Sequence, residues 1–182
     1  MKIVLVTGNK GKLNEWRRLL PTDITLESVD EDLPEIQSLD LEKIVADKAA
    51  RAFAVIGKPV VVEDVSAGLD HLGGLPGPFI KFFEKAMGLD AFYQLVTPGN
   101  NKGVATCLIG YCDGKNNFAV RGDVRGLVVP PKGDNGFGFD RCFSPEGTDK
   151  TYGEMSPKEK DAISHRAKAI KLFVEELSKI PA

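Results

Sequence analysis

The sequence predicts an α/β fold with a mixed β-sheet, and three observations support this class. Short apolar runs that are typical of buried strands recur along the chain. The stretches between several of them place apolar residues at the 3/4 spacing of an amphipathic helix. Farther along, two β-type runs flank a tight turn, as in a hairpin. Helices and strands therefore interleave, and we expect them to build one mixed sheet with helices around it.

The first third of the chain alternates strands and helices. Residues 2–6 form a β-branched and aliphatic run, and the helix after it carries a stripe of leucines with one tryptophan. A second strand is expected at 24–29. A longer apolar stripe predicts a helix over about 40–56, with Gly57 as its C-cap. The run PVVVED at 59–64 predicts a buried strand that ends abruptly in two carboxylates.

The rest of the chain changes character twice. Pro78 is well placed to open a helix, and a shorter helix is expected near 89–96. From 103 to 129 the pattern is β, with Asp113–Gly114 as the turn of a hairpin. The C-terminal region opens with the capping box SPKE. It is either one helix or two helices with Ser164 capping the second, and periodicity does not choose between them.

Composition limits the class of protein. The 182 residues suit one domain, 1–182, with enough material for a core. The formal net charge is −2, and the charges are scattered, which argues against a nucleic-acid partner. Three cysteines lack zinc or redox spacing, so a cytoplasmic protein is expected. The sequence has no membrane-length apolar run and no signal-peptide pattern, so no membrane partner is expected.

The turn between the first strand and its helix is a candidate phosphate site. Gly8 and Gly11 would permit positive φ and close approach of the backbone, and Lys10 and Lys12 add two cations. The turn is not a P-loop, because the spacing of its glycines is too short and Leu13 stands where a magnesium-binding hydroxyl is needed. From these residues alone, a phosphate site and a plain tight turn both remain open.

Carboxylates supply a candidate metal site. Glu63 and Asp64 follow an apolar strand, and α/β folds bind ligands outside the carboxyl ends of their strands. Carboxylates beside a polyphosphate commonly hold Mg²⁺. A solvated strand end is the alternative. Glu35, which follows a proline, is a further candidate, with an ordinary surface acid as its alternative.

Several other side chains could bind a nucleoside or remain structural. Phe137 to Asp140, FGFD, is either a slot in which a ring stacks on a base or an anchor that ties a loop to the core. His165 and Arg166 add hydrogen-bond donors. Three lysines lie on helices opposite the apolar stripes, where an exposed lysine needs no functional explanation: Lys48, Lys81 and Lys160.

Taken in order, these segments resemble the inosine triphosphate pyrophosphatase family, the Ham1-like nucleoside triphosphate pyrophosphatases. The similar segments are TGNKGK, DLPE, VED, LGGLPGPFIKFF, FGFD, TYGEM and EKDAISHRAKA. The resemblance implies an elongated two-lobed α/β fold, with a central mixed sheet, helices on both sides and an active-site cleft between the lobes. It also implies a homodimer. Members use Mg²⁺ to hydrolyse inosine, deoxyinosine and xanthosine triphosphates to the monophosphate and pyrophosphate.

The resemblance also implies roles for individual residues. Asp64 would be the catalytic proton acceptor and, with Glu35, a metal ligand. The implied substrate contacts are Thr7, Gly8, Asn9, Lys10, Gly11 and Lys12 for the triphosphate, the substrate-contacting lysines Lys48 and Lys81, and Phe137, Gly138, Phe139, Asp140, Lys160, His165 and Arg166 for the nucleoside. One position departs from the pattern: Val65 replaces the serine or threonine of many members, so only its backbone N–H could contact substrate.

Two other functions are compatible with the sequence. The first is a nucleotide-binding regulatory module without turnover, which would bind nucleotide without releasing pyrophosphate. The second is a pyrophosphatase for other modified nucleotides, such as the pyrimidine triphosphates of the Maf-like proteins. The SHR and FGFD segments argue against the second alternative.

Overall fold

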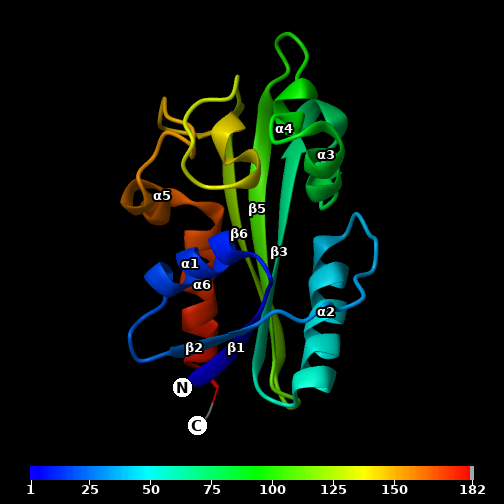
Figure 1. Cartoon of the computed structure of the whole chain (residues 1–182), viewed down its shortest axis with the longest axis vertical. Helices are drawn as coiled ribbons and strands as arrows, with labels where there is room; N and C mark the ends of the chain where they lie inside the picture. The colour runs from blue at the N-terminus through cyan, green and yellow to red at the C-terminus, as the bar shows by residue number, and fades with distance from the viewer. Residues whose placement is uncertain (181–182) are drawn as a thin grey trace. The chain divides into compact units, whose positions relative to one another are not determined.

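The computed structural model in Figure 1 describes residues 1–180. The remaining residues of the predicted domain, 181–182, lie outside the described residues. The chain forms two compact units, and neither is a continuous stretch of sequence. Unit 1 contains Met1–Asp64, Cys107–Gly122 and the chain from Arg166 onward; unit 2 contains Val65–Thr106 and Asp123–His165.

The strands follow the order β2-β1-β3-β5-β6-β7 in a mixed sheet, with β4 paired to β3. Strand β1 runs parallel to both β2 and β3, whereas β4 is antiparallel to β3 and β7 is antiparallel to β6. The strands are β1 Lys2–Val6, β2 Thr25–Val29, β3 Val60–Leu69, β4 Pro76–Gly77, β5 Lys102–Cys112, β6 Asn117–Val128 and β7 Phe143–Pro145. The predicted α/β class with a mixed sheet is confirmed.

The helices have clear sequence causes at several of their ends. Asp40 caps α2 through its side chain, and Gly57 ends that helix with φ of 66°. Ser156 and Glu159 form the predicted capping box of α5. The helices are α1 Lys10–Leu19, α2 Leu41–Ile56, α3 Ile80–Met87, α4 Ala91–Gln94, α5 Pro157–Ile163 and α6 His165–Leu177, with short 3₁₀ turns η1 Asp70–Leu72 and η2 Gly138–Cys142.

In unit 1, strand β1 and the first half of β3 are buried on both faces. Helices α1 and α6 lie on one side and α2 on the other (Figure 1). Strand β1 shows why its sequence is continuously apolar. Ile3 and Leu5 pack with α1 and α6, whereas Val4 and Val6 pack with α2.

Unit 2 has its own apolar core. Side chains of β3, β5 and β6 pack there with α3, α4 and the segment that follows β6. Its aromatic members lie edge to face or tilted: Phe92, Phe139, Phe143 and Tyr152. No helix within residues 1–180 is both long and apolar enough to cross a membrane.

Two element predictions are decided by the structure. The backbone is extended at Ser164, so α5 and α6 are separate helices rather than one. The prediction that the third strand ends at Asp64 is wrong, because β3 continues through both carboxylates to Leu69 and pairs with β4 there. The apolar run ends at residue 62, but the strand does not, since Glu63 is buried among oppositely charged partners.

Candidate active site

The turn that links β1 to α1 is organised by its own side chains. The Thr7 hydroxyl oxygen accepts from the backbone N–H of Asn9 at 3.1 Å. The Asn9 side chain accepts from the backbone N–H of Lys12 at 3.0 Å and so caps α1. The first turn of a helix presents N–H groups and the positive end of the helix dipole. With Lys10 and Lys12 in that turn, the segment has the chemistry of a site for a polyanion.

The predicted role of the glycines in this turn is wrong in one respect. Among residues 1–180, the glycines with positive φ include neither Gly8 nor Gly11, and Gly11 lies within α1. A Cβ on Gly8 would stand 2.4 Å from an Asp30 carboxylate oxygen. Gly8 therefore makes room for Asp30, a side chain that sequence spacing could not connect with it.

Glu63 and Asp64 are both buried in β3, so the alternative of a solvated strand end is wrong. Alternation along the strand places them on opposite faces. Val61 packs with α1 and α6, and Glu63, two residues later, meets the same helices. Val62 packs with α2, and the same alternation directs Asp64 toward that face.

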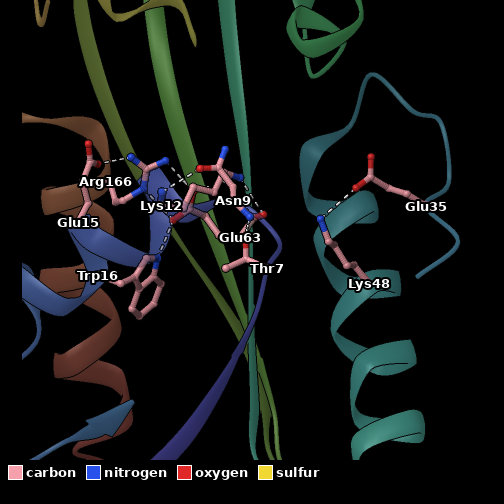
Figure 2. A network of polar contacts seen from close by, with 9 residues as sticks. All are labelled: Thr7, Asn9, Lys12, Glu15, Trp16, Glu35, Lys48, Glu63 and Arg166. Carbon is pink, nitrogen blue, oxygen red and sulfur yellow. Dashed lines mark hydrogen bonds and ion pairs between the residues drawn. The ribbon is translucent and has the colours of Figure 1, made fainter. Parts of the chain in front are cut away.

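Glu63 is the centre of a buried polar network (Figure 2). Arg166 donates to it through two atoms, Nε to Oε2 at 2.9 Å and Nη2 to Oε1 at 2.8 Å. The Trp16 indole donates to Oε2 at 2.7 Å, and the Lys12 ammonium lies 3.3 Å from Oε1. Arg166 also donates to Glu15. Two acids and two cations thus neutralise one another inside unit 1.

The network fixes the charges of its members. Burial alone would raise the pKa of Glu63, but the charges of Arg166 and Lys12, with hydrogen bonds from Arg166 and Trp16, lower it well below its ordinary value. Burial alone would lower the pKa of Arg166, but Glu63 and Glu15 hold it well above its ordinary value. Glu63 is therefore a permanent anion at neutral pH and is unsuited to accept a proton.

Glu35 and Lys48 form a second, separate pair beside α2 (Figure 2). The Lys48 ammonium donates to Glu35 Oε2 at 3.0 Å, and both side chains are mostly buried. Within residues 1–180, no three His, Cys, Asp or Glu side chains lie in a cluster that could hold a metal ion. Mg²⁺ beside a polyphosphate needs only one or two protein carboxylates, so the prediction of Glu35 and Asp64 as its ligands stays a prediction.

In unit 2, Asp140 gathers two donors around one oxygen. Its Oδ2 accepts from the Lys160 ammonium at 2.6 Å and from the backbone N–H of Phe137 at 2.8 Å. Lys160 also lies over the rings of Phe137 and Tyr152, at 5.0 and 5.4 Å. Gly136, with φ of 79°, is required here because a Cβ would stand 2.1 Å from Asp140 Oδ2.

Comparison with known proteins covers nearly the whole length of this chain. The model of the Ham1 family matches residues 3–176. The chain belongs to the Ham1 family. It is 40% identical to a protein of Yarrowia lipolytica named inosine triphosphate pyrophosphatase, over 97% of both chains. It is 38% identical to a dITP/XTP pyrophosphatase of Methanopyrus kandleri, over 96% of this chain and 95% of that protein.

Solved structures agree with the sequence comparisons. The Ham1 protein of Staphylococcus aureus superimposes with a TM-score of 0.83 at 26% identity, covering 98% of each chain. The Ham1 protein of Coxiella burnetii gives 0.81 at 26% identity, covering 99% of this chain and all of that one. The resemblance inferred from the sequence motifs is confirmed.

The structure shows where each of the predicted site residues lies. It corrects two interpretations. Lys160 is buried at 4% exposure in an ion pair, and it is not an exposed helix lysine. Phe139 is buried against Phe92 and Phe143, so its ring anchors the loop and cannot stack on a base. Phe137, which is only partly buried, keeps the stacking interpretation open.

The remaining predicted residues divide between the two units. Val65 and His165 pack in unit 2, where His165 lies against Phe139 and Tyr152. Lys81, also in unit 2, places its ammonium 5.2 Å from the ring centre of Phe82. Arg166 belongs to unit 1, so the two consecutive donors His165 and Arg166 lie in different units.

Sequence reasoning missed three residues that the Ham1 fold brings to these clusters. Glu15 and Trp16 join the Glu63 network, and the only sequence signal was an acid next to the tryptophan of an apolar stripe. Glu84 on α3 lies close to Asp140, and no sequence pattern indicated it. Burial, and then the charge of Asp140, raise the pKa of Glu84 to about 7.

Proposed function

We propose that this chain hydrolyses inosine, deoxyinosine and xanthosine triphosphates to the nucleoside monophosphate and pyrophosphate, and so clears deaminated purines from the nucleotide pool. The observation that carries the proposal is the β1–α1 turn. There a helix N-terminus carries Lys12, whose ammonium contacts β3, the strand that also bears the buried Asp64. Such a turn suits a polyphosphate. The names of the relatives at about 40% identity supply the substrate class.

The proposed reaction is attack of water on the α-phosphorus, with pyrophosphate as the leaving group. Asp64 accepts the proton of the attacking water. The turn from Thr7 to Lys12 binds the triphosphate, and Lys48 and Lys81 are assigned to its negative charge. Little covalent chemistry falls to the protein in such a step, so positioning and charge neutralisation carry most of the rate enhancement.

We assign Mg²⁺ to Glu35 and Asp64. Their chemistry fits, because hard carboxylate oxygens are the ligands that this ion prefers. A bound Mg²⁺ would neutralise phosphate charge at this place. Since Glu35 accepts from Lys48, that carboxylate would serve the ion and the lysine together.

We assign the nucleoside to the loop of Phe137, Gly138 and Asp140, with Lys160 and His165 as donors. A 6-oxo purine presents an acceptor, which suits donors, whereas adenine presents a 6-amino donor at that position. Arg166 reaches a base only through N–H groups other than those that bind Glu15 and Glu63.

We further propose a homodimer in the cytoplasm, built from one functional domain per chain. Both units are assembled from segments spread along the sequence, which supports a single functional domain. We propose nucleotides and a second copy of the chain as the only partners. A net charge of −2 supports the exclusion of nucleic acid and of a membrane surface. Sedimentation velocity tests the dimer directly.

The decisive experiment is incubation with inosine triphosphate and Mg²⁺, with ATP as comparison substrate. We expect monophosphate and pyrophosphate from inosine triphosphate, and far less product from ATP. Asp64→Asn should lower kcat by about 10²–10⁴, the usual value of a general base. Asp149→Asn, an exposed acid outside the site, is the matched control and should keep wild-type activity.

Three outcomes would contradict the proposal in whole or in part. Diphosphate and inorganic phosphate as products would mean that a different bond breaks. Nucleotide binding without any turnover would leave the regulatory module as the function. If Asp64→Asn retained more than about a tenth of wild-type kcat, the proton acceptor would have to be another residue.

A further inference from the structure

We infer that Trp16 is a positioning residue of the phosphate site: its indole N–H orients Glu63, and Glu63 in turn holds the Lys12 ammonium at the start of α1. The inference rests on the proposed role of the β1–α1 turn in binding triphosphate. Trp16 itself is fully buried, so a bound substrate cannot reach its side chain. Its effect therefore passes through the carboxylate and the lysine (Figure 2).

The two oxygens of Glu63 have different partners. Oε2 accepts from the Trp16 indole at 2.7 Å and from Arg166 Nε at 2.9 Å. Oε1 accepts from Arg166 Nη2 at 2.8 Å and faces the Lys12 ammonium at 3.3 Å. Arg166 binds both oxygens and so sets the plane of the carboxylate, and the Trp16 indole adds a second donor that holds Oε2 in place. Oε1 is then kept toward Lys12.

Packing fixes the tryptophan in turn. Its ring lies edge to face with Phe173 of α6, with centroids 5.6 Å apart, inside the apolar cluster of α1, α6 and the sheet. Phenylalanine or leucine would fill this position on packing grounds alone. The indole N–H is what a purely apolar side chain would lack, and it points at the one buried carboxylate that contacts Lys12.

Holding Lys12 in advance should help binding. A free lysine side chain loses much rotamer freedom when it meets a phosphate, and a pre-ordered one loses less. Lys12 contacts both Oε1 and the backbone carbonyl of Glu63, each at 3.3 Å. Without Trp16, Oε2 loses one of its two donors and Arg166 alone holds that oxygen, so the position of the carboxylate before Lys12 is less closely fixed.

The test is Trp16→Phe, which keeps an aromatic ring and removes the donor. We expect KM for inosine triphosphate to rise about fivefold with kcat within about twofold of wild type, because the lost effect concerns ground-state and transition-state binding alike. In a Lys12→Ala background, the same substitution should change KM no further. An equal rise in both backgrounds would overturn the inference, because Trp16 would then act independently of Lys12.

Tyr111→Phe is the matched control. Tyr111 belongs to the same apolar cluster, and its hydroxyl donates to Asp113 at 3.2 Å, away from the Glu63 network. It should leave KM at the wild-type value although it also removes one aromatic hydrogen bond. A KM rise equal to that of Trp16→Phe would mean that loosening of the core explains the effect, which overturns the inference.

A binding measurement separates this inference from the proposed function. Inorganic triphosphate is titrated calorimetrically into wild type, Trp16→Phe, Lys12→Ala and the double variant. If wild type hydrolyses no inosine triphosphate, the proposed function fails. The positioning role is still supported if Trp16→Phe weakens triphosphate binding in wild type but not in the Lys12→Ala background. If the two substitutions weaken triphosphate binding additively, the positioning role is overturned.

Fluorescence gives a readout that needs no core substitution. Trp16 is the sole tryptophan of the chain, so all tryptophan emission reports on this network. Inorganic triphosphate should change the emission of wild type as Lys12 shifts its contacts, and Lys12→Ala should lose that change. An equal emission change in both proteins would overturn the inference, even if Trp16→Phe fails to fold.

Discussion

Replacing Arg166 with methionine is predicted to destabilise this protein far more than the loss of an ordinary arginine ion pair. The Arg166 side chain is 1% exposed and lies between two acids that are also buried, Glu63 at 1% and Glu15 at 5%. Methionine is shorter than arginine but close to it in volume, so it leaves little cavity while it removes the guanidinium donors. The cost therefore comes from the carboxylates, which lose their main cation while remaining away from water.

The size of the effect can be worked out from this burial. Breaking a buried ion pair by removing one partner costs about 3–5 kcal/mol. For a chain of 150–250 residues, each kcal/mol lowers Tm by about 2–4 °C. We therefore expect Arg166→Met to melt about 6–20 °C below wild type near neutral pH.

The effect should also depend on pH, with a sign set by Glu63. In the folded wild type the pKa of Glu63 is lowered, so its contribution to stability is present above the unfolded pKa of about 4.5 and is lost as the pH falls. Without Arg166, burial favours the protonated acid and its pKa rises. The variant therefore gains stability relative to wild type as the pH falls. The difference in Tm between the two proteins is smaller at pH 4.5 than at pH 7.5.

Thermal unfolding followed by circular dichroism at these two pH values is the assay. Arg51→Met is a matched control, because Arg51 also binds a carboxylate through two atoms, to Asp47 at 2.6 and 3.0 Å, but on an exposed helix face. It should melt close to wild type at both pH values. A loss below about 1 kcal/mol for Arg166→Met, or the same loss at both pH values, would refute the reasoning.

Two further predictions concern single carboxyl groups. Glu35→Gln should raise the Mg²⁺ concentration needed for half-maximal hydrolysis after EDTA treatment, because an amide oxygen is a weaker ligand; an unchanged requirement would exclude Glu35 from the metal site. Glu84→Gln should stabilise the protein more at pH 8 than at pH 5, since the raised pKa of Glu84, about 7, makes wild type lose stability as the pH rises from about 4.5 to 7. Thermal melts of both proteins at the two pH values check this, and parallel pH profiles would contradict it.

Most of the secondary structure was predictable because its causes are local. The burial of β1 follows from an unbroken apolar run, and the end of α2 follows from Gly57 in the left-handed region. The capping box before α5 needs only four residues to form. What the sequence could not decide was the break at Ser164, because a helical apolar period continues across it.

The length of β3 was mispredicted for a physical reason that applies widely. Two adjacent acids after an apolar run resemble a strand that has reached solvent. Here Glu63 is satisfied by Arg166, which lies 103 residues farther along the chain. Burial of a charge depends on partners that local sequence does not reveal, so a strand can continue through a carboxylate where hydropathy predicts its end.

The candidate site shows the same division between local and distant causes. Alternation alone separates Glu63 from Asp64, so the sequence could predict that the two acids have different surroundings. It could not predict which surroundings each acid meets. On one face, α1 and α6 supply Lys12, Trp16 and Arg166, which make Glu63 a fixed anion in a structural network. Asp64 is directed to the other face, toward α2, and that difference is the physical reason to assign proton transfer to Asp64 rather than to its neighbour.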